Sequence, residues 1–299
     1  MKRILAFMMA LLLITSFIAC ASKQDSTPDN TNDTALDTAD ASTSAVANGS
    51  DRLAKIKEQG YIEVCTEPYF APYEFVDSTK TGDEQYVGLD MEIARQIAAD
   101  LGVDLKIVPL EFSAVLAGIT DGKYDLAISC IAYSPERAEN MAMSNGYFFL
   151  NDGYGLLVRE EDKDKYNTLE DTKDAVFATQ SGSVMEAIYN QYVTESAGLK
   201  VFGTMTDAYL AVSEGKADVC IVGAATGESY AQANGGLAVA AYRFPSDESL
   251  TGFRVAATLG GTDSLIEAVN ETIAKLREEG KPEQWFDEYT AYAKSLGIE

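Results

Sequence analysis

The sequence predicts an α/β fold with two similar lobes, because strand-like and helix-like segments alternate and one unit occurs twice. Residues 112–130 combine an amphipathic helix, a Gly-Lys turn and an apolar strand, and residues 205–223 repeat this order. Repeated helix–turn–strand units pack helices against a sheet, so we expect two lobes of α/β type, each with a mostly parallel sheet. Helix–strand units are common in proteins, and chance similarity is the alternative explanation of the repeat.

Other segments of the body, 51–299, fit the same pattern. Residues 61–66 and 104–110 are largely apolar and predict strands. Between them, residues 89–102 place apolar side chains on one helical face and end in Gly102, a typical helix stop. The length of the body is sufficient for two modest lobes.

The N-terminal 50 residues are predicted to lie outside this fold. Lys2 and Arg3 precede an apolar stretch, so residues 1–19 predict a secretory signal peptide that is too short for a membrane span. Cys20 follows and resembles the lipid-carrying cysteine of bacterial lipoproteins; simple secretion with cleavage elsewhere is the alternative. Residues 21–50 are small and polar, and they predict a disordered tether because they bury too little apolar surface to offset the cost of ordering.

The composition excludes several functions. The chain has 47 acidic and 23 basic residues, a formal net charge of −24, so a phosphate backbone would be repelled and nucleic acid is not an expected partner. The absence of histidine excludes histidine-based catalytic triads and histidine-ligated metals. Besides Cys20, the chain has Cys65, Cys130 and Cys220, an odd number in apolar runs, which predicts buried free thiols. We expect no metal and no cofactor.

A predicted helix start in the first lobe carries an arginine. Ser134 is a good N-cap, Pro135 suits the first helical position, and Arg137 lies in that first turn. A cation is mildly unfavourable at a helix N-terminus. Arg137 therefore either binds an anionic ligand or is a surface residue paired with Glu136 or Glu139, and the spacing favours neither.

A second predicted helix start lies in the other lobe. The strand at 175–179 leads into Gly182 and Ser183, which open a helix. Backbone N–H groups at a helix start can hold an anion, although most such turns are simple caps. Two anion-binding helix starts would be informative if they faced each other.

The body of the chain resembles the bacterial extracellular solute-binding proteins that supply polar amino acids to ABC transporters. The segments that carry the resemblance are 66–75, 86–103, 112–129, 134–148, 178–187, 207–222 and 268–289, in the family's order. The resemblance implies a two-lobed, periplasmic-binding-protein-like (type II) clamp with two hinge crossings, near 148–152 and 242–252. Lobe 1 would comprise 51–149 plus 250–299, and lobe 2 would comprise 150–249.

The resemblance also implies which residues bind the ligand. Arg137 matches the arginine that binds the ligand's α-carboxylate, and Phe70 and Phe112 match aromatics that enclose the ligand, although both could be core residues. Glu67 stands where the family usually has aspartate. Asp90 matches an aspartate that contacts a basic ligand in some members and is structural in most. The predicted ligand-binding set is Glu67, Phe70, Phe112, Ser129, Cys130, Ala132, Arg137, Gln180, Ser183, Val184 and Gly223.

Two residues depart from the family pattern. Ala132 replaces a serine or threonine beside the carboxylate, which removes a hydrogen bond of about 1 kcal/mol. Gly223 stands where the family has the aspartate that holds the α-ammonium, and a buried unpaired ammonium would be costly. Either Glu67, Glu228 or another acid takes this role, or the ligand has no such ammonium; we favour the first explanation.

The expected function is binding and not catalysis. We expect an extracytoplasmic monomer, anchored to the cell membrane by a lipid on Cys20, that captures a small amino acid or related carboxylate between its lobes. An ABC permease in the membrane would receive the ligand. One alternative is a dehydratase of the same fold that acts on precursors of aromatic amino acids, with Glu67 as general acid. Another is a sensor that presents the ligand to a receptor.

Overall fold

The computed structural model describes residues 51–298, which belong to one compact unit. The predicted signal peptide, the lipid site at Cys20 and the predicted tether lie outside the described residues. Among residues 51–298, no helix is both long and apolar enough to cross a membrane.

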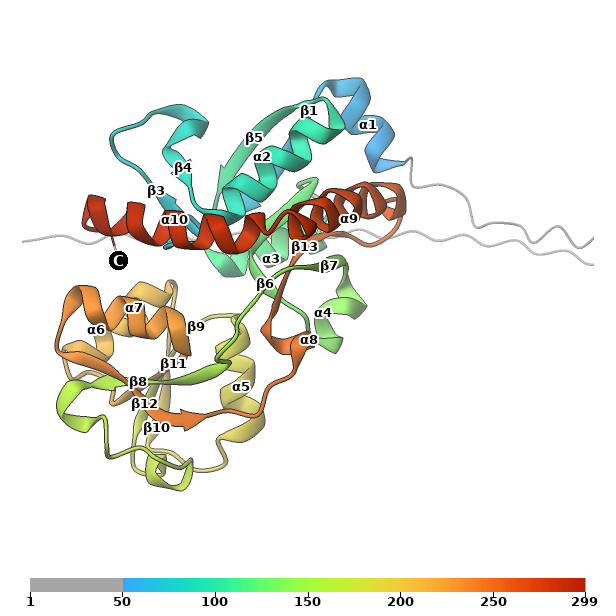
Figure 1. Ribbon diagram of the computed structural model, residues 1–299. Helices are drawn as coiled ribbons and strands as arrows, with labels where there is room; N and C mark the ends of the chain where they lie inside the picture. Colours follow the sequence, from blue (N-terminus) through green and yellow to red (C-terminus); the bar gives the residue numbers. More distant parts are fainter. Residues whose placement is uncertain (1–50, 299) are drawn as a thin grey trace, which may run out of the picture. The chain divides into compact units, whose positions relative to one another are not determined.

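The first sheet has five strands in the order β5-β1-β6-β13-β7 (Figure 1). Its strands are β1 (Tyr61–Thr66), β5 (Asp104–Pro109), β6 (Leu126–Ala132), β7 (Met141–Phe149) and β13 (Gly252–Thr258). β1 pairs in parallel with β5 and β6, whereas β13 pairs antiparallel with β6 and β7. The helices of the same part of the chain are α1 (Arg52–Gln59), α2 (Leu89–Leu101), α3 (Phe112–Thr120), α4 (Pro135–Asn140), α9 (Asp263–Glu278) and α10 (Lys281–Leu296).

A small antiparallel sheet lies between β1 and α2 in the chain. It consists of β2 (Tyr69–Phe70), β3 (Glu74–Val76) and β4 (Tyr86–Val87), with a 3-10 turn η1 (Gly82–Gln85) before the last strand. Glu74 of β3 is buried in this structure. This sheet therefore brings a carboxyl group to the carboxyl end of the first large sheet, where Ser129 of β6 donates a hydrogen bond to it.

The second large sheet has the order β10-β9-β11-β8-β12. Its strands are β8 (Tyr154–Arg159), β9 (Val176–Gln180), β10 (Gly198–Phe202), β11 (Val219–Gly223) and β12 (Leu237–Arg243). β9 pairs in parallel with β10 and β11, whereas β8 pairs antiparallel with β11 and β12. The accompanying helices and turns are η2 (Glu160–Asp162), η3 (Glu170–Thr172), α5 (Val184–Tyr192), α6 (Met205–Ser213), α7 (Ala224–Asn234) and α8 (Glu248–Thr251).

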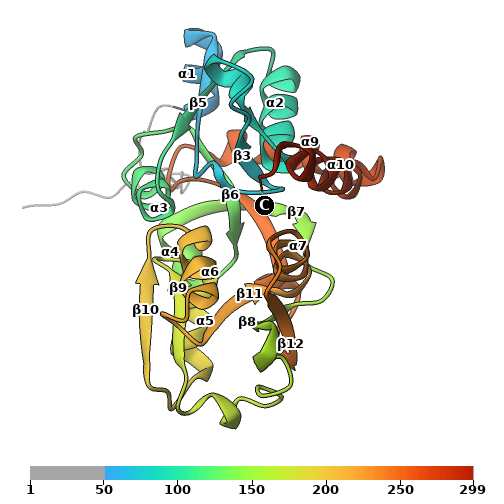
Figure 2. The same ribbon diagram turned by 90° about the vertical axis from the view of Figure 1, so that its left-hand side faces the viewer.

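The prediction of mostly parallel sheets is wrong for half of the strand pairs. In each large sheet two pairs are parallel and two are antiparallel. The antiparallel pairs involve β7, β8, β12 and β13, the strands next to the points where the chain passes from one sheet to the other (Figure 2). A strand that enters a sheet from the other lobe runs against its neighbours, and local sequence patterns do not encode this direction.

The internal repeat predicted from the sequence is confirmed by the strand order. The unit α3–β6 and the unit α6–β11 place their strands third in their sheets, next to β1 and β9 respectively. Gly122 and Gly215 form the turn in the two units, with φ of 71° and 70°. Both need the left-handed conformation, which glycine adopts at no steric cost.

Replacement of Gly215 by alanine is expected to destabilise the protein by about 1–2 kcal/mol. A Cβ atom there would meet no neighbour within 4 Å, so the cost arises from the positive φ and not from a clash. Thermal or denaturant unfolding measures it. The control is Gly203→Ala, at a glycine that lacks a positive φ and has Glu111 at 3.5 Å from the added atom. Equal stability of Gly215→Ala and wild type would contradict this explanation of the turn.

The chain crosses between the large sheets twice. β7 ends at Phe149 in the first sheet and β8 begins at Tyr154 in the second; β12 ends at Arg243 and β13 begins at Gly252. We propose lobe limits of 51–149 plus 250–299 for lobe 1 and 150–249 for lobe 2, because these limits fall within the two crossings.

The cysteines are free thiols among the described residues. Cys65 and Cys220 are fully buried, as predicted, whereas Cys130 is only partly buried. Burial raises the pKa of Cys65 to about 12, so its thiol stays neutral and behaves as a small apolar side chain. Cys130 differs because it faces a cavity.

Candidate ligand site

A cavity of about 40 Å³ lies where the carboxyl ends of strands from both large sheets approach each other. Nine of the residues predicted from the sequence line it: Glu67, Phe70, Phe112, Ser129, Cys130, Gln180, Ser183, Val184 and Gly223. Ala132 and Arg137 do not line it. Residues that the sequence prediction missed also line it: Glu74, Leu150, Tyr154, Met185, Met205, Thr226 and Phe253.

The strand topology explains this gathering. Glu67 directly follows β1, Ser129 and Cys130 are in β6, Gln180 ends β9, and Gly223 ends β11. The carboxyl ends of parallel strands share one edge of a sheet, which is where open α/β folds bind ligands. A water molecule needs about 10–15 Å³ in such a cavity, so 40 Å³ holds a few waters, and an amino acid requires the lobes to part.

Glu67 links the two sheets through Gln180. Its Oε1 accepts a hydrogen bond from Nε2 of Gln180 at 2.9 Å, and the glutamate is only 2% exposed. Burial raises the pKa of Glu67 to about 8, and the hydrogen bond from Gln180 offsets only part of this effect. The Tyr73 hydroxyl, between β2 and β3, and the Thr226 hydroxyl, in α7, form a second link between the two parts of the chain at 3.1 Å.

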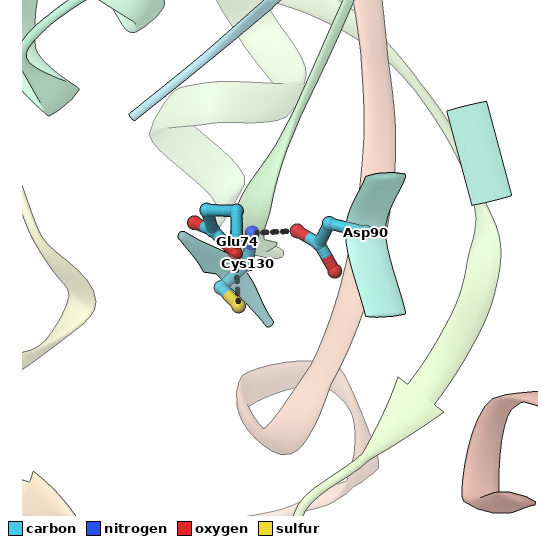
Figure 3. A group of neighbouring side chains, drawn as sticks. All are labelled: Glu74, Asp90 and Cys130. Atoms are coloured by element: carbon cyan, nitrogen blue, oxygen red, sulfur yellow. Dashed lines mark hydrogen bonds between the residues drawn. The ribbon is translucent and has the colours of Figure 1, made fainter. Parts of the chain in front are cut away.

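Glu74, Asp90 and Cys130 are neighbouring side chains (Figure 3); Glu74 and Asp90 are buried, Cys130 is partly buried, and Glu74 and Cys130 line the cavity. Ser129 Oγ donates to Glu74 Oε1 at 2.9 Å, and Cys130 Sγ lies 3.6 Å from Glu74 Oε2. Asp90 Oδ2 accepts the backbone N–H of Cys130 at 2.8 Å, at a residue with φ of 47°. Asp90 thus holds an unfavourable backbone conformation in place, which supports the structural explanation of this residue.

The same three side chains are the group among the described residues that could ligate a metal, since one donor atom of each lies within 4.8 Å of the others. Burial raises the pKa of the Cys130 thiol well above its usual value. A thiol binds a metal as the thiolate, and the carboxyl oxygens already accept hydrogen bonds from Ser129 and Cys130. The donor set therefore does not favour a metal, and we assign none.

Arg137 lies at the start of α4 and contacts Gly182, which follows β9 of the second large sheet. Its Nη1 donates to the Ala132 carbonyl at 2.6 Å, and its Nη2 donates to the Gly182 carbonyl at 2.9 Å. Among the described residues it forms no ion pair, with Glu136 and Glu139 included. Burial lowers the pKa of Arg137 to about 10, so the guanidinium is charged at neutral pH.

The helix start predicted in lobe 2 faces Arg137, as the hydrogen bond to Gly182 shows. Ser183 caps α5 by accepting the N–H of Glu186 at 3.2 Å. The Glu186 carboxylate in turn accepts the N–H of Gly182 at 2.7 Å. The N–H of Ser183 donates to the Gln180 carbonyl at 3.2 Å, so groups of the chain itself already accept both N–H groups at this helix start.

The aromatic residues predicted for the site pack against neighbouring apolar groups and also face the cavity. Phe70 stacks on Tyr73 with ring centroids 5.3 Å apart, and Phe112 is 6% exposed within a buried cluster. Both also line the cavity. The Arg137 guanidinium lies 5.7 Å from the Phe112 ring, which places a cation over an aromatic face at the edge of the site.

The structure places two candidate acids differently. Glu67 lines the cavity, whereas Glu228 does not and lies 3.7 Å from Arg243 in an exposed ion pair. Glu228 therefore does not replace the acidic side chain that the family has where this chain has Gly223. Glu74 was not predicted, because in the sequence it is one residue of a short apolar segment, and its proximity to Ser129 depends on contacts between distant segments.

Comparisons with known proteins agree with this geometry. Residues 62–292 match the bacterial extracellular solute-binding proteins, family 3. The L-cystine-binding protein TcyJ of Escherichia coli K12 is 26% identical over 239 residues, which cover 78% of this chain and 85% of TcyJ. A crystal structure of an amino acid ABC transporter substrate-binding protein from Streptococcus pneumoniae bound to L-arginine has a TM-score of 0.74 and 31% identity, covering 81% of this chain and 98% of that protein.

An enzyme is also among the relatives. The cyclohexadienyl dehydratase of Pseudomonas aeruginosa is 29% identical over 119 residues, or 40% of this chain and 42% of the dehydratase. This match is much shorter than those to the binding proteins.

The architecture and the matches define an extracytoplasmic solute-binding protein with the type II periplasmic-binding fold, which confirms the predicted fold class. The chain belongs to the bacterial extracellular solute-binding proteins, family 3.

Proposed function

We propose that this protein binds a small amino acid or a related carboxylate between its lobes and delivers it to an ABC permease. The observation that carries the proposal is the cavity at the carboxyl ends of strands from both large sheets, in a chain that matches the family over 62–292. Both sheets supply its wall, so opening and closing of the lobes would control access to it.

The carboxylate of the ligand would bind to Arg137. This guanidinium forms no ion pair among the described residues and contacts Gly182, next to the start of α5 in lobe 2. Its bonds to the two backbone carbonyls are replaceable by a bidentate carboxylate, the geometry that arginine matches best. The hydrogen bonds Glu67–Gln180 and Tyr73–Thr226 join the two parts of the chain and would hold the closed form.

The proposal also concerns where the protein is located in the cell envelope. A lipid on Cys20 would anchor the protein, the segment 21–50 would act as a tether, and the folded body would work as a monomer without a cofactor. Delivery to a permease requires such a position at the membrane surface. Presentation of the ligand to a receptor is compatible with the same site.

Catalysis as a dehydratase is the second candidate function, and one observation favours it. Glu67 faces the cavity with a pKa raised to about 8, which suits a general acid. We nevertheless propose a binding protein, because the relatives matched over most of this chain are binding proteins. Formation of an aromatic product from a cyclohexadienyl substrate would reverse this assignment.

Thermal unfolding against a panel of ligands tests the proposed function. The chain from residue 21 onward would be unfolded alone and with each common amino acid, its deaminated carboxylate and a few dipeptides. A ligand that binds the folded state raises the midpoint in proportion to RT ln(1 + [L]/Kd). We expect at least one amino acid to raise it at millimolar concentration or below. A panel without any shift would contradict the proposal.

A further inference from the structure

The acidic side chains of the cavity are on one wall. Among the described residues that line it, Glu67 and Glu74 are the acids, and both belong to the part of the chain before the first crossing. The wall contributed by lobe 2 consists of apolar, hydroxyl and amide side chains. Among the described residues that line the cavity, the acidic side chains available to a cationic group are therefore all in lobe 1.

The end of β11 cannot supply this charge. Gly223 has no side chain, and a Cβ atom placed there would lie 3.2 Å from Cδ1 of Leu150. This distance is tighter than an ordinary van der Waals contact, so the leucine occupies the space into which an acidic side chain would extend. The nearest polar side-chain atom is the Thr226 hydroxyl oxygen, 3.5 Å from the same position.

Glu74 is the acid of the cavity that lacks a link to lobe 2. Glu67 is engaged by Gln180 across the site, whereas Glu74 bonds within lobe 1, to Ser129, to the Asp90 side chain and weakly to Cys130. No lysine or arginine among the described residues pairs with Glu74. Ionisation of a buried carboxyl without a cation is costly, and a cationic ligand would offset that cost.

We propose that Glu74 supplies the negative charge that binds a cationic nitrogen of the ligand, in place of an acidic side chain at position 223. This inference rests on the proposed function, since it concerns the same cavity. It assigns the ligand to the class of carboxylates that also carry a cationic nitrogen. The nitrogen is either the α-ammonium or a cationic side-chain group, and the experiment distinguishes the two.

Binding of a cation by Glu74 has a consequence for protons. Burial, with Asp90 and Glu67 nearby, raises the pKa of Glu74 well above its usual value, which favours the neutral carboxyl in the ligand-free protein. The other titratable groups that face it are Cys130 and Tyr147, whose pKa values burial also raises. A bound cation favours the ionised form of Glu74, so binding releases a proton and tightens as the pH rises.

Calorimetric titration of the chain from residue 21 onward tests this. The probes are L-arginine, 4-guanidinobutyrate with only a side-chain cation, L-norvaline with only the α-ammonium, and valerate with neither. Each titration is repeated at one pH in buffers of different ionisation enthalpy, which counts the protons released. The variants are Glu74→Gln, which keeps the shape and the hydrogen bond from Ser129, and Glu228→Gln, an acid outside the cavity.

We expect wild type to release protons when it binds L-arginine. Glu74→Gln is expected to weaken L-arginine binding at least tenfold and to abolish the proton release, while Glu228→Gln behaves as wild type and valerate binding is unaffected by either change. If Glu74→Gln also weakens L-norvaline binding, the α-ammonium is the group that Glu74 binds. If it weakens 4-guanidinobutyrate binding, the side-chain cation is that group. Either result supports the proposal.

Equal binding of L-arginine by wild type and Glu74→Gln overturns the proposal and leaves the proposed function intact. Binding of L-arginine without proton release has the same meaning. Wild type alone can give this result, so the test remains valid if Glu74→Gln does not fold. Preference of wild type for valerate over all three cationic probes also overturns it. Binding of none of the four probes contradicts the proposed function itself.

Discussion

Replacement of Arg137 by alanine is expected to weaken ligand binding by at least about 100-fold. The guanidinium would form two charge-assisted hydrogen bonds to the ligand carboxylate, each contributing about 1.5–3 kcal/mol, and tenfold in affinity corresponds to about 1.4 kcal/mol. Its charge is half-buried and unpaired among the described residues, so the site depends on it for an anion. Arg137→Lys should retain part of the affinity, because an ammonium keeps the charge but loses the bidentate geometry.

Isothermal titration with the amino acid identified in the unfolding panel measures this effect. The matched control is Arg277→Ala, since Arg277 also donates to a backbone carbonyl, that of Gly146, and also lies over an aromatic ring, that of Phe149, but does not contact Gly182 as Arg137 does. Affinity equal to that of wild type in Arg137→Ala would remove Arg137 from the site. A loss of equal size in Arg277→Ala would show that the effect arises from folding.

The ligand-free protein is expected to be more stable at pH 5 than at pH 8. The pKa of Glu67 is raised to about 8 in the folded state, from 4.5. A group with a raised folded-state pKa stabilises the fold fully below its unfolded-state pKa, and this contribution is lost as the pH rises through the folded-state pKa. The loss between pH 4.5 and 8 is up to about 1.4 kcal/mol per pH unit.

Two other buried carboxyls act in the same direction. The pKa of Asp90 is raised to about 6, mainly by burial, so its contribution is lost between pH 3.8 and 6. The pKa of Glu74 is also raised, well above its usual value. The three groups therefore give a stability that falls from acidic to neutral pH, opposite to the behaviour of salt-bridged carboxylates.

Glu67→Gln identifies the contribution of Glu67. An amide does not titrate, and Oε1 of the new side chain can still accept the hydrogen bond from Gln180. We expect the thermal midpoint of this variant to vary less between pH 5 and 8 than that of wild type. The control is Glu267→Gln, at an exposed position of α9, which should keep the full pH dependence. A pH profile of Glu67→Gln identical to wild type would contradict the raised pKa.

The predictable part of the structure is the part encoded by local patterns. The helix 89–102, the strand pattern at 61–66 and the two Gly-Lys turns depend on periodicity and on single residues with special backbone needs, and all are present. The direction of β13 was not predictable, because its neighbours β6 and β7 are more than a hundred residues away in the chain. The direction of such a strand depends on the lobe from which the chain enters the sheet.

The candidate site follows the same division. Gln180, Ser183 and Gly223 are at strand ends or helix starts, and sequence reasoning found them there. Glu74 was missed because its neighbours Ser129 and Cys130 belong to a distant strand. The hydrogen bonds of Arg137 to two carbonyls could not be predicted either, since the Gly182 carbonyl belongs to the other sheet.

The position of β13 has a consequence for the order in which the two large sheets fold. β13 lies between β6 and β7 and pairs with both, so the first sheet is interrupted until residues 252–258 have joined it. The second sheet comes from the continuous segment 154–243 and needs no later residue. During synthesis and export, the middle of the chain can therefore form its sheet first, while the earlier strands β6 and β7 depend on a partner that arrives last.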